Sequence, residues 1–395
     1  MVEYNPFMDE ILYGDPYPVY RRMRAEDPVY YVEEYDAWFL SRFEDIWRAG
    51  PDYEHFTATE GTTPPHLLTK DTPLNLSFAS MDPPQHSKYR AQVAGLFKPG
   101  AVRRVEHELR PIVAGLVDAF IERGECDLVQ DLAAQVSVRG ALSVIGLPLE
   151  LAERASGWVN GIFAREDGHR GATSKSMEGA KDMFFTVLDH VKRARKDPEK
   201  ATGVMKVVMN SDVEGDKMDD FRLASLCCVV LIGGTDTLPK ALAATLYRLW
   251  QNPDQRRALA RDLSLVPDAF LEGLRLDTPT QHLGRTVIRD VEFGGKKLRP
   301  GQKCMFMWAS ANRDEAEFDA PDEYRMRRRP PRMLAFGHGV HACLGKHVAL
   351  MEARLALEEV MRRLPEYQID EAKAVRNRTE FVRGWVSLPA SFEPA

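Results

Sequence analysis

One cysteine, Cys343, lies in a glycine-rich loop directly before a strongly helical segment. Residues 336–345 read Phe-Gly-His-Gly-Val-His-Ala-Cys-Leu-Gly. Glycines let the backbone turn tightly and let a flat ligand approach, and the free N–H groups at a helix start favour a thiolate. A thiolate is the ligand that a soft metal ion or a haem iron prefers. A buried structural cysteine is the alternative, and the loop alone does not decide between the two.

Two further pairs of residues have helical spacing. Glu272 and Arg275 are three residues apart and can pair on one helix face. His86 and Arg90 are four residues apart, after an Asp-Pro-Pro sequence that predicts a helix start capped by Asp82. A His/Arg face can bind carboxylates through charge-assisted hydrogen bonds. Each pair alone is equally consistent with a solvated helix surface.

A third feature lies inside an apolar helical pattern, where residues 231–239 read Leu-Ile-Gly-Gly-Thr-Asp-Thr-Leu-Pro. Gly233 and Gly234 each cost about 1 kcal/mol relative to alanine in a helix, and Pro239 cannot donate a helical hydrogen bond. Asp236 and Thr237 add polar groups that cost free energy when they are buried without partners. Strain and polarity at one turn suggest a functional site, although a kinked core helix is the alternative.

The composition excludes several classes of protein. The 395 residues include 53 Lys and Arg against 59 Asp and Glu, a net charge of −6, which argues against a nucleic-acid binder. The five cysteines form no Cys-x-x-Cys pair, so we expect neither a disulfide framework nor a structural zinc module. The start resembles no signal peptide, and the longest apolar run, 226–234, is short for a membrane span. We therefore expect a cytoplasmic protein that does not bind membranes.

Helical patterns dominate from Asp82 onward, so the predicted fold class is mainly α with a small β portion. The clearest helices are predicted over 102–123, 184–194, 223–250 and 348–364. The proline-rich part at about 1–80 is predicted to be rich in loops and short strands. A β portion is predicted at about 285–308, with a hairpin at Gly294-Gly295. We expect one domain over 1–395, whose helical bulk lies at about 82–280 and 345–365.

The loop around Cys343 resembles the haem-binding signature of the cytochrome P450 family, aromatic-x-x-Gly-x-basic-x-Cys-x-Gly. The residues that match are Phe336, Gly339, His341, Cys343 and Gly345. With the other three motifs in the family's order, the resemblance extends from Asp15 to the C-terminus. It implies the cytochrome P450 fold, with haem b (iron protoporphyrin IX) buried between the helix at 223–250 and the helix after the cysteine loop.

The resemblance also assigns roles to residues. Cys343 corresponds to the axial ligand of the haem iron, and the haem propionates would be bound by His86, Arg90, Arg285 and His341. Glu272 and Arg275 match the family's structural Glu-x-x-Arg pair. Its third member is an arginine of the run 325–329, where we assign Arg328, although the family's Asp-Pro is replaced here by Arg325-Met326.

The motif at 233–237 resembles the family's oxygen groove and is most similar to that of camphor-hydroxylating types. Gly233 and Gly234 would leave room for dioxygen, and Asp236 and Thr237 would supply protons. Leu238 stands where many members have a second threonine, and Pro239 is less usual.

The implied activity is that of a haem-thiolate monooxygenase, which inserts one atom of dioxygen into a small hydrophobic substrate, a terpenoid or an aromatic compound. Electrons would come from a ferredoxin-type donor with a separate reductase, which basic residues at Arg103, Arg104, Arg110 and Lys346 would steer. The candidate substrate pocket comprises His66, Leu74, Phe78, Phe163, Phe184, Val230, Thr280, His282, Leu283 and Val382.

Two alternatives remain. One is haem-thiolate chemistry without oxygen insertion, either peroxide-driven or a dehydration, against which the intact Asp236-Thr237 pair argues. The other is a non-catalytic binding or sensor protein in which Cys343 is structural, which leaves the order of the four motifs unexplained.

Overall fold

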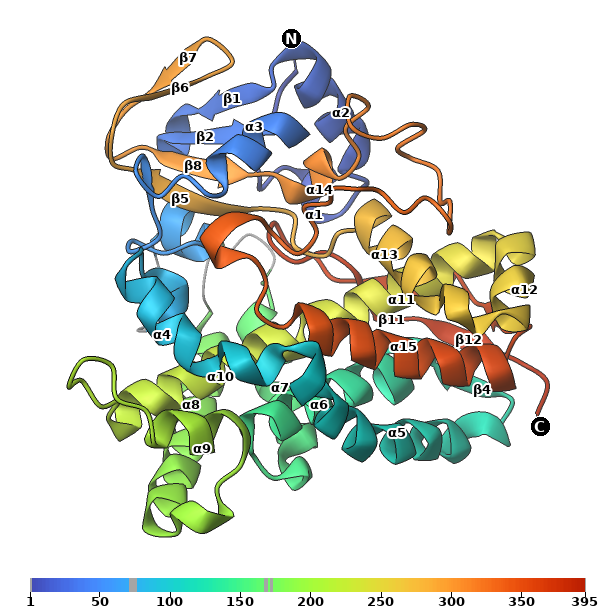
Figure 1. Ribbon diagram of the computed structural model, residues 1–395. Coiled ribbons are helices and arrows are strands. Elements are labelled where there is room, and N and C mark those ends of the chain that lie inside the picture. Colours follow the sequence, from blue (N-terminus) through green and yellow to red (C-terminus); the bar gives the residue numbers. More distant parts are fainter. Residues whose placement is uncertain (1, 71–76, 167–169, 171–172, 395) are drawn as a thin grey trace.

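The computed structural model describes residues 2–70, 77–166, 170 and 173–394 (Figure 1). Its largest sheet has five strands, in the order β1-β2-β8-β5-β3. The pairing of β2 with β8 is parallel and the other pairings are antiparallel. Strands from the N-terminal part and from the predicted β portion at 285–308 are therefore paired in one sheet. They are β1 (Val29–Val32), β2 (Ala37–Leu40), β3 (Phe56–Thr57), β5 (Leu283–Val287) and β8 (Lys303–Phe306).

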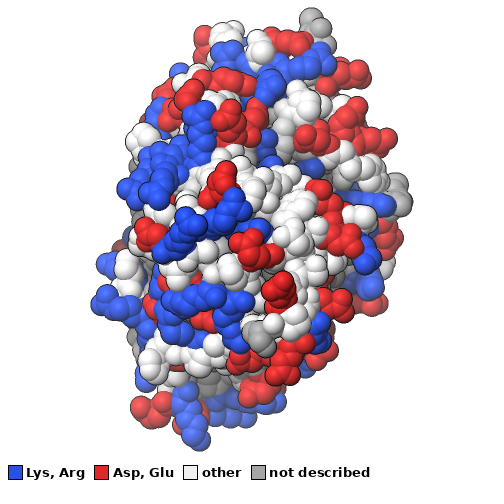
Figure 2. Space-filling view, turned by 90° about the vertical axis from the view of Figure 1, so that its right-hand side faces the viewer, with Lys and Arg blue, Asp and Glu red and all other residues white. Residues whose placement is uncertain are grey.

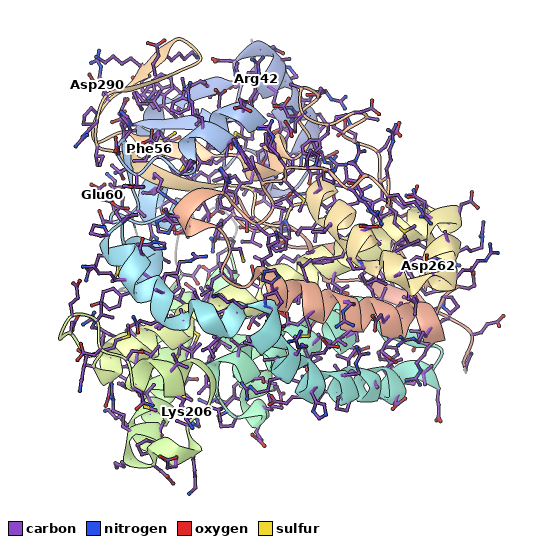
Figure 3. The ribbon with its side chains drawn as sticks, in the orientation of Figure 1. Arg42, Phe56, Glu60, Lys206, Asp262 and Asp290 are labelled. Atoms are coloured by element: carbon purple, nitrogen blue, oxygen red, sulfur yellow. The ribbon has the colours of Figure 1, made fainter. Side chains whose placement is uncertain are left out.

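Short helices surround this sheet at the top of Figure 1: α1 (Asp9–Leu12), α2 (Tyr17–Glu26), α3 (Phe43–Ala49) and α14 (Trp308–Ala311). Strand β3, which pairs with β5 at the edge of the sheet, is also held by side-chain contacts in its vicinity (Figure 3). The ring centre of Phe56 lies 5.9 Å from that of Phe306, and Glu60 accepts a hydrogen bond from Lys303 at 2.6 Å. Because it contains α1, α2 and α3, the N-terminal part has more helix than the predicted strands and loops.

The rest of the molecule is a helical body whose main core lies among α5, α6, α10, α11, α13 and α15 (Figure 1). The helices predicted over 102–123, 184–194 and 348–364 are confirmed with shifted ends, and the one predicted over 223–250 is present as two helices. The helices of the body are α4 (Gln85–Ala94), α5 (Pro99–Ile121), α6 (Ala134–Ile145), α7 (Ala152–Phe163), α8 (Ser174–Lys196), α9 (Gly203–Met209), α10 (Asp220–Thr235), α11 (Thr237–Gln251), α12 (Pro253–Arg261), α13 (Val266–Leu276) and α15 (Lys346–Arg363).

The long helix predicted over 223–250 is interrupted. Helix α10 ends at Thr235 and α11 begins at Thr237, so Asp236 lies at the junction. The break follows from Pro239, because its ring nitrogen has no hydrogen to donate to the carbonyl of Thr235. The polar residues Asp236 and Thr237 therefore lie at the interruption of the helix.

Smaller β elements complete the fold. The predicted hairpin is present as β6 (Val291–Phe293) and β7 (Lys296–Leu298), with positive φ at both Gly294 and Gly295. Strands near the C-terminus, and the short strand that they pair with, were not predicted, because each is only two or three residues long. They are β4 (Glu125–Asp127), β9 (Gln368–Ile369), β10 (Val375–Arg376), β11 (Trp385–Ser387) and β12 (Pro389–Ser391).

The helix cap predicted at Asp82 is wrong. The side chain of Asp82 accepts from the backbone N–H of Ala58 at 2.9 Å and from the Thr57 hydroxyl, and Pro84 is the residue before α4. The long-range contact satisfies the carboxylate and joins the start of α4 to the sheet.

Among the described residues, one stretch, Asp220–Gln251, is long and apolar enough to cross a membrane by length and composition. In that stretch 56% of the apolar window is buried inside the protein, as in a core helix. This is weak evidence for a membrane span.

Candidate active site

The cysteine loop is held by backbone hydrogen bonds and two glycines with positive φ. The N–H of Cys343 donates to the carbonyl of Phe336 at 2.7 Å, and that of Ala342 donates to Gly339 at 3.0 Å. Gly337 and Gly339 have φ values of 68° and 78°, which favour glycine. The loop delivers Cys343 to the start of α15 at Lys346, as the sequence predicted.

The sequence argument about the Cys343 thiol is only partly right. Backbone N–H groups of Gly345 and Lys346, together with Arg90, do lower its pKa, but desolvation is larger and the net pKa is raised. Of the five cysteines, Cys343 alone is exposed. The Cys343 thiol thus has open space beside it and is also surrounded by protein, as expected for a group that faces an enclosed space inside the molecule. A bound metal ion would deprotonate it outright.

Four basic side chains lie close to this loop and to one another. The ring of His86 lies 4.2 Å from that of His341, and Arg90 donates to the carbonyl of Ala342. Burial and the charges of Arg90 and Arg285 lower the pKa of His86 to about 4. Burial lowers the pKa of Arg285 to about 10. Arg90 and Arg285 therefore carry the positive charge of the cluster, and a bound anion would balance it.

The donor set of this cluster fits the two carboxylates of a haem. His86 is 1% exposed, and neither of its ring nitrogens has a hydrogen-bond partner. In the described part of the chain, none of the four side chains forms an ion pair, although the charge of Asp82 raises the pKa of His86 and of Arg285 and so balances part of the cluster. Buried donors without acceptors cost free energy, so a dianionic ligand beside Cys343 would satisfy both the charge and the hydrogen bonding.

The glycines of α10 form another part of the candidate site. Gly233 is exposed although neighbouring Leu231 is fully buried, and a Cβ at Gly233 would have no atom within 4 Å. A Cβ at Gly234 would instead approach Ala141 at 3.0 Å. The Thr237 hydroxyl donates to the carbonyl of Gly233 at 3.4 Å. Open space beside one glycine and a hydroxyl matches a groove for a small molecule.

Asp236 has a partner that the sequence analysis missed. Lys240 donates to one carboxylate oxygen of Asp236 and, at 3.1 Å, to its backbone carbonyl oxygen. Both side chains are buried, and the second carboxylate oxygen of Asp236 has no partner. The spacing of four residues was the signal that could have revealed this pair.

The predicted structural pair is a buried network. Arg275 donates to both carboxylate oxygens of Glu272 at 2.8 and 2.9 Å, and these residues are 0% and 1% exposed. Arg328 donates to Glu272 at 2.9 Å and also to backbone carbonyls of residues 319–323. Within the run 325–329, Arg328 is thus the side chain that reaches Glu272, whereas the Arg325 side chain pairs with Asp319 and Glu323.

The candidate pocket residues lie on several segments. Phe78 packs against His86, with ring centres 6.1 Å apart. Thr280 and Val382 form an isolated β-bridge, which places the stretch after α13 beside the late turn. His66, Val230 and Leu283 are half-buried. Leu74 lies outside the described residues.

Two of the candidate pocket residues, His282 and Phe184, are not placed as residues that line an open pocket would be. His282 is fully buried, and its ring packs against Phe39 of β2 at 5.8 Å. Phe184 contacts Phe221 at 4.6 Å, in a cluster where Phe221 is 52% exposed. The sequence assigned both residues to the pocket because of the segments on which they lie. It could not show toward which side of its segment each ring points.

A contact between two pocket segments was also missed. Phe163 contacts Phe381 with ring centres 6.0 Å apart, and Arg165 forms a largely buried ion pair with Glu380 at 3.0 Å. These pairs join the end of α7 to the late turn, more than two hundred residues away in sequence. No local pattern predicts such a pairing.

Comparison with known proteins supports the family resemblance that the sequence motifs indicated. A family model described as cytochrome P450 matches residues 167–392. The chain is 32% identical to cytochrome P450 130 of Mycobacterium tuberculosis over 387 residues, covering 95% of this chain and 94% of that protein. It is 33% identical to a steroid C26-monooxygenase of Mycolicibacterium smegmatis, covering 97% and 94%.

Solved structures agree with the fold. The crystal structure of CalO2 is similar to the whole chain with a TM-score of 0.89 and 27% identity, covering 100% of both chains. CYP109E1 from Bacillus megaterium in complex with testosterone is similar with a TM-score of 0.87 and 25% identity, covering 96% of this chain and 98% of that one.

Proposed function

This chain belongs to the cytochrome P450 family, and on that premise we propose that it inserts one atom of dioxygen into a small hydrophobic terpenoid or aromatic substrate, with electrons from a ferredoxin-type donor. As a haem-thiolate monooxygenase it uses haem b and dioxygen. The observation that supports the site best is the cluster of His86, Arg90, Arg285 and His341, which forms no ion pair in the described chain and lies beside Cys343.

Each part of the site has its own task. Cys343 would ligate the iron, and the basic cluster would bind the propionates by charge-assisted hydrogen bonds. When bound, haem supplies the activation of dioxygen, and thiolate ligation favours cleavage of the O–O bond. The protein sets orientation, polarity and water access.

Proton supply would depend on the turn between α10 and α11. The Thr237 hydroxyl can donate one proton and accept another, and it adjoins the open side of Gly233. Asp236 is the acid next to it in the chain, with one carboxylate oxygen unpartnered. In a relay of this kind, removal of the hydroxyl by Thr237→Ala would divert electrons from product to peroxide or water.

Apolar side chains support a hydrophobic substrate. Phe78, Phe163, Val230, Leu283 and Val382 dominate the candidate pocket, as in most sites for small organic ligands. Steroids are the first terpenoid-derived compounds to test, because one relative is named a steroid monooxygenase and one similar structure holds testosterone.

The surface proposed for the redox partner is modest in charge. Arg103 and Lys346 are exposed, whereas Arg104 and Arg110 form ion pairs with Glu108 and Glu106. The side of the molecule shown in Figure 2 mixes both signs, with more Lys and Arg toward its left edge. Exchange of a ferredoxin for a flavodoxin in the turnover assay tests the partner class.

The substrate is tested by absorption titration of the ferric protein with terpenes, aromatic acids, phenols and steroids. A substrate that expels iron-bound water shifts the haem from low to high spin. We expect one class to saturate this shift, and its product to contain one atom from isotopically labelled dioxygen. Product oxygen derived from water or peroxide instead would contradict the proposal.

A further inference from the structure

Lys240 is buried although it lies on the helix that carries the proton-delivering turn. It is 6% exposed, and Asp236 is 5% exposed. Lysine is almost never fully buried unless it is paired. Its ammonium group bonds both the carboxylate and the backbone carbonyl of Asp236, four residues earlier. Lys240 therefore makes two hydrogen bonds to Asp236, which lies at the junction between α10 and α11.

The stem of Lys240 is fixed by the late turn of the candidate substrate pocket. A Cβ at Gly384 would lie 2.4 Å from Cβ of Lys240 and 2.7 Å from its Cγ. Gly384 is itself held by Asn377, whose amide oxygen accepts the Gly384 N–H at 2.8 Å. The backbone at 384 thus lies directly against the lysine stem, whose ammonium group bonds Asp236.

The pair leaves the two oxygens of Asp236 in different situations. One is bonded to Lys240, and the other is buried without a partner. An unpartnered carboxylate oxygen in a buried place costs free energy, so the arrangement is unfavourable unless that oxygen has another role. Proton exchange with the neighbouring relay is a role that needs an oxygen without a permanent partner.

We propose that Lys240 is a positioning residue for proton delivery: it binds one carboxylate oxygen of Asp236 and so presents the other oxygen to the relay that includes the Thr237 hydroxyl. This inference rests on the proposed function. Each proton that the presented oxygen takes from water is passed on toward Thr237. The carboxylate and the ammonium then return to their starting state, and no electron moves between them.

The first test is a double-mutant cycle on stability, measured by urea unfolding of the purified holoprotein. Lys240→Met leaves Asp236 as an uncompensated buried charge, whereas Lys240→Met with Asp236→Asn removes both charges. Asp236→Asn alone completes the cycle. We expect Lys240→Met alone to have a lower unfolding midpoint than the double variant. Strictly additive losses would show that the two side chains do not act as a pair, and would overturn the proposal.

The second test measures proton delivery without an organic substrate. A plant-type ferredoxin, its reductase and NADPH supply electrons, and the ratio of hydrogen peroxide to water formed from dioxygen is measured. Peroxide uses two protons for each dioxygen and water uses four, so poor delivery favours peroxide. We expect Lys240→Met to raise the ratio about tenfold, because small displacements of a reacting group are costly.

Three variants give this test its specificity. Lys240→Arg keeps the charge and should restore most of the wild-type ratio. Gly384→Ala keeps both charges but displaces the lysine stem, and should raise the ratio. Lys206→Met, at an exposed lysine on α9 (Figure 3), should change nothing.

The decisive comparison is made in the Asp236→Asn background. There Lys240→Met should have no further effect on the ratio, because its target is gone. A wild-type ratio in Lys240→Met, or an equal effect in both backgrounds, would overturn the role of Lys240. If the wild-type protein neither takes up dioxygen nor binds haem through a thiolate, the proposed function itself fails, and this inference fails with it.

Discussion

The backbone N–H of Cys343 donates to the carbonyl oxygen of Phe336 at 2.7 Å. This bond closes the glycine-rich loop on itself and so fixes the backbone that carries the Cys343 thiol. Gly339, inside the loop, is pressed against the chain after α3, where a Cβ would lie 2.6 Å from Cα of Pro51. The loop is thus held from within and from the sheet side.

We expect Gly339→Ala to destabilise the protein and lower its haem content. Alanine at a φ of 78° costs about 1–2 kcal/mol, and the contact with Pro51 adds to this. Urea unfolding and the ratio of haem to protein measure the two effects. Gly157→Ala, in α7 with no atom within 4 Å of the new Cβ, is the control and should be neutral or slightly stabilising. Equal behaviour of the two variants would contradict this account of the loop.

Arg328→Ala should reduce the free energy of unfolding by about 3 kcal/mol, because it removes one partner of a buried ion pair. Glu272 would keep Arg275, so the loss should be smaller than for Arg275→Ala. The neighbouring Arg325→Ala is the control. Its side chain is 43% exposed in its ion pairs, which predicts a change below about 1 kcal/mol. A larger loss for Arg325 than for Arg328 would mean that the wrong arginine is assigned.

Arg285→Leu should have opposite effects on the haem-free and the haem-bound protein. Without haem, it removes a guanidinium whose burial lowers its pKa to about 10, so stability should be unchanged or higher. With haem, the loss of a charge-assisted hydrogen bond should speed haem transfer to a scavenging apoprotein about tenfold. Arg299→Leu, at an exposed arginine, should leave both measurements unchanged. Slower haem transfer from Arg285→Leu would contradict a propionate role.

His282 should make stability depend on pH. Burial lowers its pKa from 6.5 to about 4, with a smaller opposing effect of Glu380. The unfolded chain therefore takes up the proton first, and the free energy of unfolding should fall as pH drops from 6.5 toward 4, by at most about 3 kcal/mol. His282→Leu should flatten this part of the curve, measured by urea unfolding across pH. His107→Gln, at an exposed histidine, should not.

Local spacing was enough to single out the candidate residues that lie on one element or one loop, whereas their proposed roles came from the family resemblance. A few consecutive residues are enough to recognise the cysteine loop, the Glu272–Arg275 pair and the turn at Asp236. The same holds for the hairpin at Gly294, since a tight turn depends on local φ values. The Asp236–Lys240 pair is equally local, but a lysine is ordinarily solvent-exposed, and its burial is a property of the fold.

Features that depend on the tertiary fold could not be predicted this way. The raised pKa of Cys343 comes from desolvation by surrounding protein, which outweighs the local helix start. Asp82 bonds Ala58 instead of capping its own helix, because the sheet lies next to it. The Arg165–Glu380 pair joins segments that only the folded chain brings together.

The most direct test of the central claim, that Cys343 ligates haem as a thiolate, is the absorption spectrum of the reduced protein with carbon monoxide. The account predicts the strongly red-shifted Soret band that a thiolate ligand produces, and its replacement by a band of histidine type in Cys343→His. A histidine-type band in the wild-type protein, or an unchanged spectrum in the Cys343→His variant, would contradict the central claim.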